Sequence, residues 1–167
     1  EMHVAAMRAA KAGKKECDLA GIAQGIAKGC GGDLAYPIIM TVNGQTLHNH
    51  YHGNTLQDGQ LVLGDFGAEN GMHYAGYVTR TFPVAKAFTQ KQKEIYQIVL
   101  DAEEAAIQSL KPGIANKTIH LQAAKDMAEG LKSLGLMKGD MEEAVAEGAH
   151  ALFFPHGLGH MIGLDVH

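Results

Sequence analysis

The sequence predicts an α+β domain, and three observations support that fold class. Helical periodicity dominates the start of the 167 residues and returns after residue 89. Between these parts, short apolar runs separated by turn residues are typical of strands joined by hairpins. The order of helices, strands, helices and strands does not alternate as it does in βαβ units. A chain of this length can form one domain with a substantial core.

Two helices are predicted in the first third of the chain. Val4, Met7 and Ala10 recur at helical spacing, and Gly13 interrupts the pattern. A second helix begins at about Glu16 and ends in the glycine-rich turn at 29–33, because glycine clusters stop helices.

Three apolar segments then predict strands. Residues 36–42 form the first, with Pro37 near its start, where a strand tolerates proline. Residues 61–66 form a buried strand, and 72–79 form its antiparallel hairpin partner. The segment 44–60 is predicted as a loop or an edge segment.

Two longer helices follow the strands. Thr89 and Gln92 form a capping-box signature before the first, and the Lys-Pro-Gly at 111–113 ends it. The second begins at about Thr118 and stops at Gly135. The positions expected to be buried are Ile95, Val99, Ala102, Ala106 and Leu110 in the first helix, and Leu121, Met127, Ala128, Leu131 and Leu134 in the second.

The composition argues against several classes of protein. A net charge of −4 gives no electrostatic basis for binding nucleic acid or an anionic membrane. No apolar run reaches the roughly 20 residues that span a bilayer, and residues 1–16 lack the apolar core of a signal peptide. Cys17 and Cys30 are too few for a disulfide framework, so we expect reduced thiols and a cytoplasmic location. Both ends look cut, which predicts a fragment.

The histidine pair of "HGLGH", His156 and His160, is the first candidate site. The rings would share one face in a helix or in a strand, and the glycines between them favour a turn or a strand. Apolar neighbours such as Phe153 and Met161 indicate dry surroundings, where neutral imidazole can ligate a metal or shuttle protons. Two structural histidines bonded to backbone groups are the alternative.

Asp65 is the second candidate, because it lies in the predicted buried strand 61–66. A carboxylate there is costly unless it is paired or bound to a metal, although an aspartate that caps a turn would read the same way. His48, His50 and His52 alternate, so on a strand they would line one face as a metal site; a solvated loop is the alternative. Arg80 could orient a carboxylate or form an ordinary surface pair.

Three segments together carry a family resemblance. These are "LVLGDFGAENGMHYAGYVTRTFPVAKAFTQKQKEIYQIVLDAEEA", "LKPG" and "FFPHGLGHMIGLDVH". In this order the chain resembles the Xaa-Pro aminopeptidase and prolidase branch of the pita-bread metallopeptidases from about residue 36 to the end, and residues 1–35 match more loosely. The resemblance implies a partial pita-bread fold, an antiparallel sheet with helices packed on one face. It implies that 1–167 is the N-terminal and central part of the catalytic domain, truncated before the last two metal-ligand strands.

The resemblance also implies a site. In this family two Asp, one His and two Glu hold two divalent metal ions, with manganese expected and zinc or cobalt as alternatives; the metals lower the pKa of a bridging water. Asp65 matches the first Asp and His160 the histidine ligand, while His156 and His167 match histidines implied in binding substrate. For a further substrate histidine, His48 matches by distance to Asp65 and His50 by sequence context, and both stay open.

Tyr77 departs from the family pattern, because it stands where the second Asp ligand belongs. A phenol has an ordinary pKa near 10 against about 4 for Asp, and it must lose its proton to ligate well. The two Glu ligands are expected after the end of this chain. We therefore expect the metals to be absent or depleted here.

The position of Tyr77 depends on the turn of the hairpin. A two-residue turn at Asn70-Gly71 would leave Tyr77 on the face opposite to that of Asp65. A three-residue loop or a bulge would bring position 77 opposite Asp65, as a shared ligand site requires.

The sequence thus predicts a metal-dependent aminopeptidase or dipeptidase that cleaves before proline by attack of metal-bound hydroxide, with this chain inactive as it stands. The expected partners are a peptide with proline at its second position and further copies of the chain, with no nucleic acid and no membrane. The alternatives are a non-catalytic peptide-binding protein of the same fold and a small zinc-binding protein that uses the histidines of 48–52.

Overall fold

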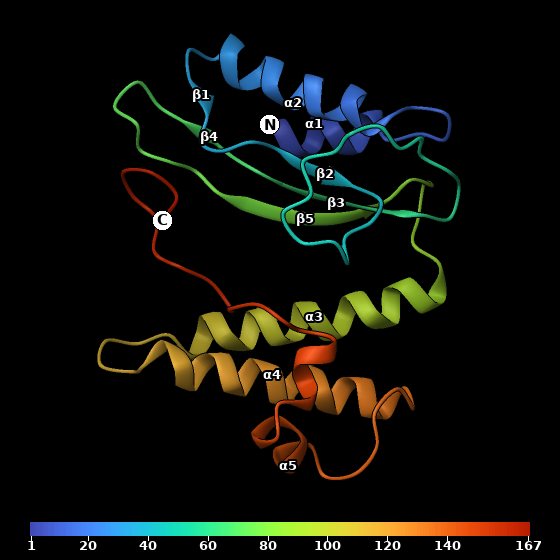
Figure 1. Ribbon diagram of the computed structural model, residues 1–167, viewed down its shortest axis with the longest axis vertical. Coiled ribbons are helices and arrows are strands. Elements are labelled where there is room, and N and C mark those ends of the chain that lie inside the picture. The colour runs from blue at the N-terminus through green and yellow to red at the C-terminus, as the bar shows by residue number, and fades with distance from the viewer. The chain divides into compact units, whose positions relative to one another are not determined.

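A computed structural model describes residues 1–167, which form two compact units. The first unit comprises Glu1–Thr89 together with Met161–His167, and the second comprises Gln90–His160 (Figure 1). None of the helices combines the length and the apolar character that crossing a bilayer requires.

The first unit places two helices, α1 (Met2–Ala9) and α2 (Glu16–Gly29), on one face of a sheet (Figure 1). Both helices were predicted, and α2 ends in the expected glycine turn, where Gly31 has a φ of +82°. Small side chains let the two helices approach each other and the sheet. The buried core of this unit is Met2, Ala6, Ala10, Leu19, Ala20, Ala23, Ala27, Ile38, Met40, Leu56, Val62, Phe66, Phe82 and Val84.

The sheet of the first unit is antiparallel, with the order β2 (Ile39–Thr41), β3 (Leu61–Phe66) and β5 (Val78–Pro83). A separate two-stranded ladder joins β1 (Asp33–Leu34) to β4 (Ala68–Glu69). In β3, buried and half-buried residues alternate, so Val62 and Phe66 face the helices. The mixture of helices and antiparallel strands confirms the predicted α+β fold class.

Two predicted strands have different bounds in the structure. The strand predicted over 36–42 is limited to Ile39–Thr41, because Pro37 has no amide hydrogen for a ladder. The strand predicted over 72–79 begins only at Val78. Residues 70–74 form a tight loop instead, in which the Asn70 side chain accepts hydrogen bonds from the amides of Met72 and Tyr74.

The second unit is helical. Its elements are α3 (Gln90–Ser109), α4 (Asn116–Ser133), α5 (Met141–Ala146) and the 3₁₀ helix η1 (Ala149–Leu152), and α3 and α4 lie side by side (Figure 1). Gly130 of α4 permits this approach, because a Cβ there would lie 2.6 Å from Cγ2 of Ile98. Gly135, with a φ of +74°, ends α4 as predicted.

The predicted apolar stripes of α3 and α4 are only partly buried. Ala102, Ala106, Ala128 and Leu131 are buried as expected. Five positions that were predicted to be buried are exposed instead: Ile95, Val99, Leu110, Leu121 and Leu134. The buried core of this unit therefore combines alanines of both helices with Ile119 and Leu131 of α4.

Candidate functional site

Asp65 of β3 lies between two tyrosines. The hydroxyl of Tyr36 donates a hydrogen bond of 2.5 Å to Oδ1 of Asp65, and the hydroxyl of Tyr77 donates one of 3.1 Å to Oδ2. The two phenol rings also stack, with centroids 5.2 Å apart and planes inclined by 29°. Each oxygen of the carboxylate is therefore paired with a phenol.

The register of the hairpin explains how Tyr77 reaches Asp65. Asp65 pairs with Thr79, and the ladder continues to a bridge between Glu69 and Ala75, which places Tyr77 opposite Gly67. The loop closes around residues 71–73, so the predicted two-residue turn is wrong. With three loop residues, Tyr77 lies on the same face of the sheet as Asp65, as expected for that loop length. The expectation that such a loop brings Tyr77 opposite Asp65 is wrong, however, because Tyr77 lies opposite Gly67, two residues along the ladder.

Gly67 allows the hairpin to close tightly beside this carboxylate. A Cβ at Gly67 would lie 1.7 Å from the carbonyl oxygen of Gly76, which no side chain could tolerate. The amide of Gly76 also donates to the carbonyl of Ala68 at 2.8 Å. Gly67 lies only two positions after Asp65. The close backbone contact at Gly67 therefore places Tyr77 near that carboxylate.

The surroundings keep both phenols protonated. Burial, followed by the hydrogen bond to Asp65 and the charge of that carboxylate, raises the pKa of Tyr36 well above its ordinary value. Burial is also the main cause that raises the pKa of Tyr77, and the charge of Asp65 adds to it, while a hydrogen bond with Thr79 acts in the opposite direction. Neither tyrosine is therefore disposed to become a phenolate.

This donor set does not fit a centre of two divalent metals. Two neutral hydroxyls donate into the carboxylate oxygens that a cation would need, and no group of three or more His, Cys, Asp or Glu side chains is arranged to hold a metal ion. Sequence reasoning missed Tyr36, because nothing in "LAYPII" indicates that its hydroxyl reaches a residue 29 positions away.

The histidines of the loop 48–52 do not line a strand. His48 is exposed and has a left-handed backbone, with a φ of 52°. The rings of His50 and His52 both turn to the carbonyl of Ile38, at 3.4 and 3.0 Å. The loop alternative is therefore right, and these two imidazoles donate to backbone rather than forming a metal site with one another.

Glu16 anchors this histidine loop, and sequence reasoning missed it. The side chain is fully buried at the start of α2, where Oε1 accepts from the amide of Val42 at 2.8 Å and Oε2 from that of Asn54 at 3.1 Å. The side-chain amide of Asn54 donates to both oxygens. In return, the amides of Glu16 and Cys17 donate to the carbonyls of Asn54 and His52 at 3.0 Å each.

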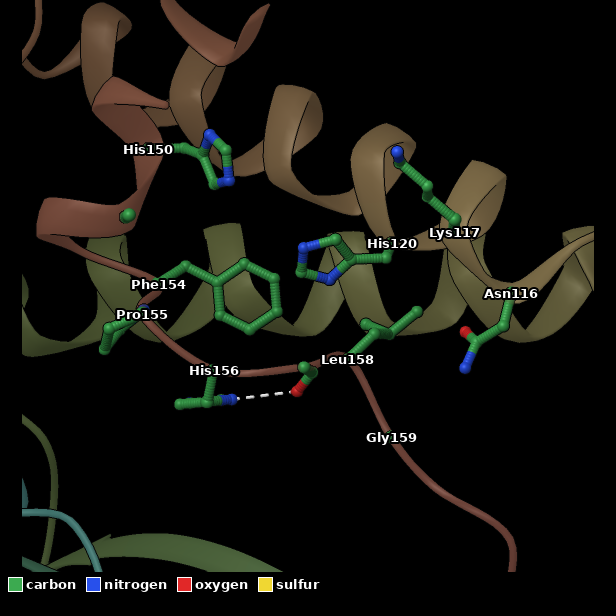
Figure 2. Close-up of a pocket in the computed structure, with 11 residues that line it drawn as sticks. Asn116, Lys117, His120, His150, Phe154, Pro155, His156, Leu158 and Gly159 are labelled. Carbon is green, nitrogen blue, oxygen red and sulfur yellow. Dashed lines mark hydrogen bonds between the residues drawn. The ribbon is translucent and has the colours of Figure 1, made fainter. Parts of the chain in front are cut away.

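The "HGLGH" histidines lie in the second unit, in a segment without regular structure. Nδ1 of His156 donates to the carbonyl of Gly157 at 2.9 Å, and its ring meets that of Phe154 edge-on at 4.9 Å (Figure 2). His156 thus has the backbone partner expected of a structural histidine. His160 ends the second unit, so neither unit by itself holds both Asp65 and His160.

The last predicted residues belong to the first unit. The segment 163–165 pairs with the hairpin loop, with bridges and bonds from Tyr74 to Leu164 and from Ala75 to Gly163. His167 is exposed at the end of this segment. Arg80 donates to the carbonyl of Thr79 at 2.7 Å, and Cys17 and Cys30 are free thiols.

The whole chain, residues 1–167, matches the family model of metallopeptidase family M24. The chain belongs to metallopeptidase family M24. It is 44% identical over 137 residues to the Xaa-Pro aminopeptidase of Escherichia coli K12, a match that covers 79% of this chain and 31% of the relative. It is 37% identical over 171 residues to a probable Xaa-Pro aminopeptidase of Phaeosphaeria nodorum, covering 99% of this chain and 36% of the relative.

Solved structures of similar proteins confirm the fold. E. coli aminopeptidase P with the inhibitor Pro-Leu has a TM-score of 0.95 to this chain at 40% identity, and the zinc-substituted enzyme in complex with product has a TM-score of 0.94. Both matches cover 99% of this chain and 38% of the solved chain. The partial aminopeptidase fold predicted from the sequence is thus confirmed, and the chain spans about a third of the length of these relatives.

Proposed function

We propose that this chain is part of a protein built as a metal-dependent Xaa-Pro aminopeptidase, the class that hydrolyses the peptide bond before proline, and that its own site does not carry that reaction. Membership of the M24 family and the names of the relatives support the substrate class. The family implies divalent metal ions, for which we propose manganese in an intact site, with zinc or cobalt as alternatives.

The observation that carries the proposal is the hydrogen bonding of Asp65. A metal at this carboxylate would compete with the hydroxyls of Tyr36 and Tyr77 for the oxygen lone pairs. Tyr77 stands at the position expected for the second Asp ligand, yet it contributes a bulky neutral group instead of a second negative charge. Removing one carboxylate from a site for two divalent cations weakens the electrostatic balance at both positions.

The remaining predicted roles stay part of the proposal. We assign His160 as a metal ligand and His156 and His167 as groups that contact a bound peptide. Either His48 or His50 is the further substrate histidine. The exposure of His48, His156 and His167 is compatible with a role toward a ligand. A cytoplasmic location and a homo-oligomeric state also remain predictions.

A second candidate is a peptide-binding protein of the same fold without catalysis. The double pairing of Asp65 favours it specifically, because a carboxylate whose two oxygens already accept hydrogen bonds is stable without a metal. Under this reading the fold is retained and the tyrosines replace the metals as the partners of Asp65.

The test compares the full-length protein with its Tyr77→Asp variant, using an Xaa-Pro peptide and added manganese. We expect no cleavage by the wild type, and for Tyr77→Asp a gain in manganese affinity of at least about tenfold together with cleavage. Tyr74→Asp is the matched control, because Tyr74 is an exposed tyrosine of the same hairpin, and it should bring no gain.

Three results would contradict parts of this proposal. Cleavage by the wild type with two bound metals would exclude the non-catalytic candidate and the inactivity of this site. A Tyr77→Asp variant that gains neither metal nor activity would show that position 77 is not the ligand position. Metal binding by Tyr77→Asp without cleavage would favour the peptide-binding candidate.

A further inference from the structure

The second unit contains a pocket in which His156 is the only lining residue that already has a proposed role. It has a volume of about 350 Å³ and lies between the start of α4 and the segment 150–159 (Figure 2). Its polar walls come from Asn116, Lys117, His120 and His150, and it also touches His156, whose Nδ1 is already bonded to Gly157. No carboxylate lines it. The polar groups around the pocket are thus cationic or able to donate hydrogen bonds.

His120 of α4 and His150 of η1 face each other across this pocket. Their ring centroids are 6.2 Å apart, and Figure 2 shows a nitrogen of each ring turned toward the other ring. In each ring Nδ1 is buried and has no hydrogen-bond partner. Because Nε2 is not buried in this way, Nε2 is the nitrogen that each histidine presents to the pocket.

The buried Nδ1 atoms decide what the histidines offer to a ligand. A neutral imidazole carries one N–H and one lone pair. Leaving an N–H donor buried without an acceptor is costly, so the proton belongs on Nε2, where the pocket can supply a partner. Both rings then present N–H donors to the pocket. A metal ion would need the Nε2 lone pairs, which would force both protons onto the buried Nδ1 atoms. The arrangement therefore favours a ligand that accepts hydrogen bonds.

The start of α4 adds positive potential to the same pocket. Its N-cap residue, Ala115, has no side chain that caps the helix, and no acidic residue lies in the first turn. The free amide groups and the helix dipole there attract an anion, and Lys117 adds a full charge. We infer that this pocket binds an organic carboxylate, held between the imidazole N–H groups of His120 and His150, Lys117 and the first turn of α4.

The apolar walls specify the rest of the ligand. Phe154 packs at 5.1 Å from the ring of His120, and Leu158 packs against the cluster of Ala106, Ile119 and Ala123. An inorganic oxyanion would leave these surfaces unused, whereas a carboxylate on an aliphatic body, such as the C-terminal residue of a peptide, would cover them. Binding here does not depend on the proposed peptidase function.

The experiment follows the histidine Hε1–Cε1 NMR signals of full-length protein labelled with ¹³C-histidine. The probes are N-acetyl-L-leucine, its neutral analogue N-acetyl-L-leucinamide, and inorganic phosphate. We expect N-acetyl-L-leucine to shift two histidine signals in a saturable way, and His120→Asn and His150→Asn to assign those signals. The amide should cause no saturable shift, because it lacks the charge that the pocket recognises.

Lys117→Met and Lys138→Met provide the matched pair of variants. Lys117→Met should weaken the binding of N-acetyl-L-leucine about threefold, as expected for the loss of one exposed ion pair. Lys138 is exposed and outside the pocket, so Lys138→Met should bind like the wild type. The inference is overturned if the amide binds as tightly as the acid, if phosphate binds more tightly than either, or if the two lysine variants behave alike.

Discussion

The junction at Glu16 and the sheet face at Asp65 are both built on a carboxylate whose two oxygens accept hydrogen bonds, yet their partners differ. Glu16 is fully buried and takes its bonds from the backbone amides of Val42 and Asn54 and from the Asn54 side chain. Asp65 is half-buried and takes its bonds only from the side chains of Tyr36 and Tyr77.

This difference in partners means that Glu16 is a structural carboxylate, whereas a single substitution of a tyrosine can remove a hydrogen bond from Asp65. Backbone amides are present whatever the sequence, so the role of Glu16 is tied to the path of the chain. The phenols at Asp65 are side chains, and one substitution frees an oxygen for another partner. Three further predictions test this contrast, from the largest expected effect to the smallest.

Replacing Glu16 should have the largest effect on stability. Glu16→Ala leaves the part-buried amides of Val42 and Asn54 without acceptors, so we expect the free energy of unfolding to fall by about 3 kcal/mol. Urea denaturation of the full-length protein, followed by circular dichroism, measures this loss. Glu16→Gln should lose about half as much, because the amide keeps one acceptor oxygen.

Glu103→Ala is the control for Glu16, since Glu103 is an exposed glutamate of α3. Its free energy of unfolding should stay within about 0.5 kcal/mol of the wild type. If Glu16→Ala lowers the free energy of unfolding no more than Glu103→Ala does, the distinction between Glu16 and Asp65 is wrong.

The two tyrosines at Asp65 should contribute unequally. Tyr36→Phe removes the 2.5 Å hydrogen bond from a side chain that is mostly buried, and we expect a loss of about 1.5 kcal/mol in the free energy of unfolding. Tyr77→Phe removes a 3.1 Å bond from a side chain that is 37% exposed, so the loss should be about 0.5 kcal/mol. The same urea titrations measure both, and the opposite order would mean that Tyr77 is the main partner of Asp65.

The smallest effect should come from His3, which packs beside the sheet and makes the free energy of unfolding depend on pH. Its ring stacks on Phe66 with centroids 3.9 Å apart and donates to the carbonyl of Val78 at 2.7 Å. Burial is the main cause that lowers the pKa of His3 below its ordinary value of 6.5, and the charge of Arg80 adds to it, against the hydrogen bond to Val78.

The sign of this effect follows from proton uptake. Below pH 6.5 the unfolded chain protonates His3 before the folded chain does, so stability falls as the pH decreases from about 7 toward 5. His3→Gln should flatten the dependence of the free energy of unfolding on pH in that range. An identical slope for His3→Gln and the wild type would contradict the assignment.

Local patterns predicted most of the elements because the physics that forms them is local. The bounds 61–66 of β3 and the start of α2 at Glu16 follow from apolar runs and from helical spacing. The start of β5 at Val78 could not be read in this way. The loop 70–74 is made by the side chain of Asn70, which competes with the ladder for the amides of Met72 and Tyr74.

The sequence by itself determined the α+β class and the family resemblance, and it predicted that Tyr77 stands where an aspartate ligand is expected. Residue identity and spacing are enough for such statements. Only the tertiary structure decided that Tyr36 and Tyr77 both donate to Asp65, that Glu16 anchors the histidine loop, and that His120 and His150 face one pocket. The physical reason is that these partners lie 12 to 38 positions apart along the chain, so chain folding alone brings their donors and acceptors within hydrogen-bond distance.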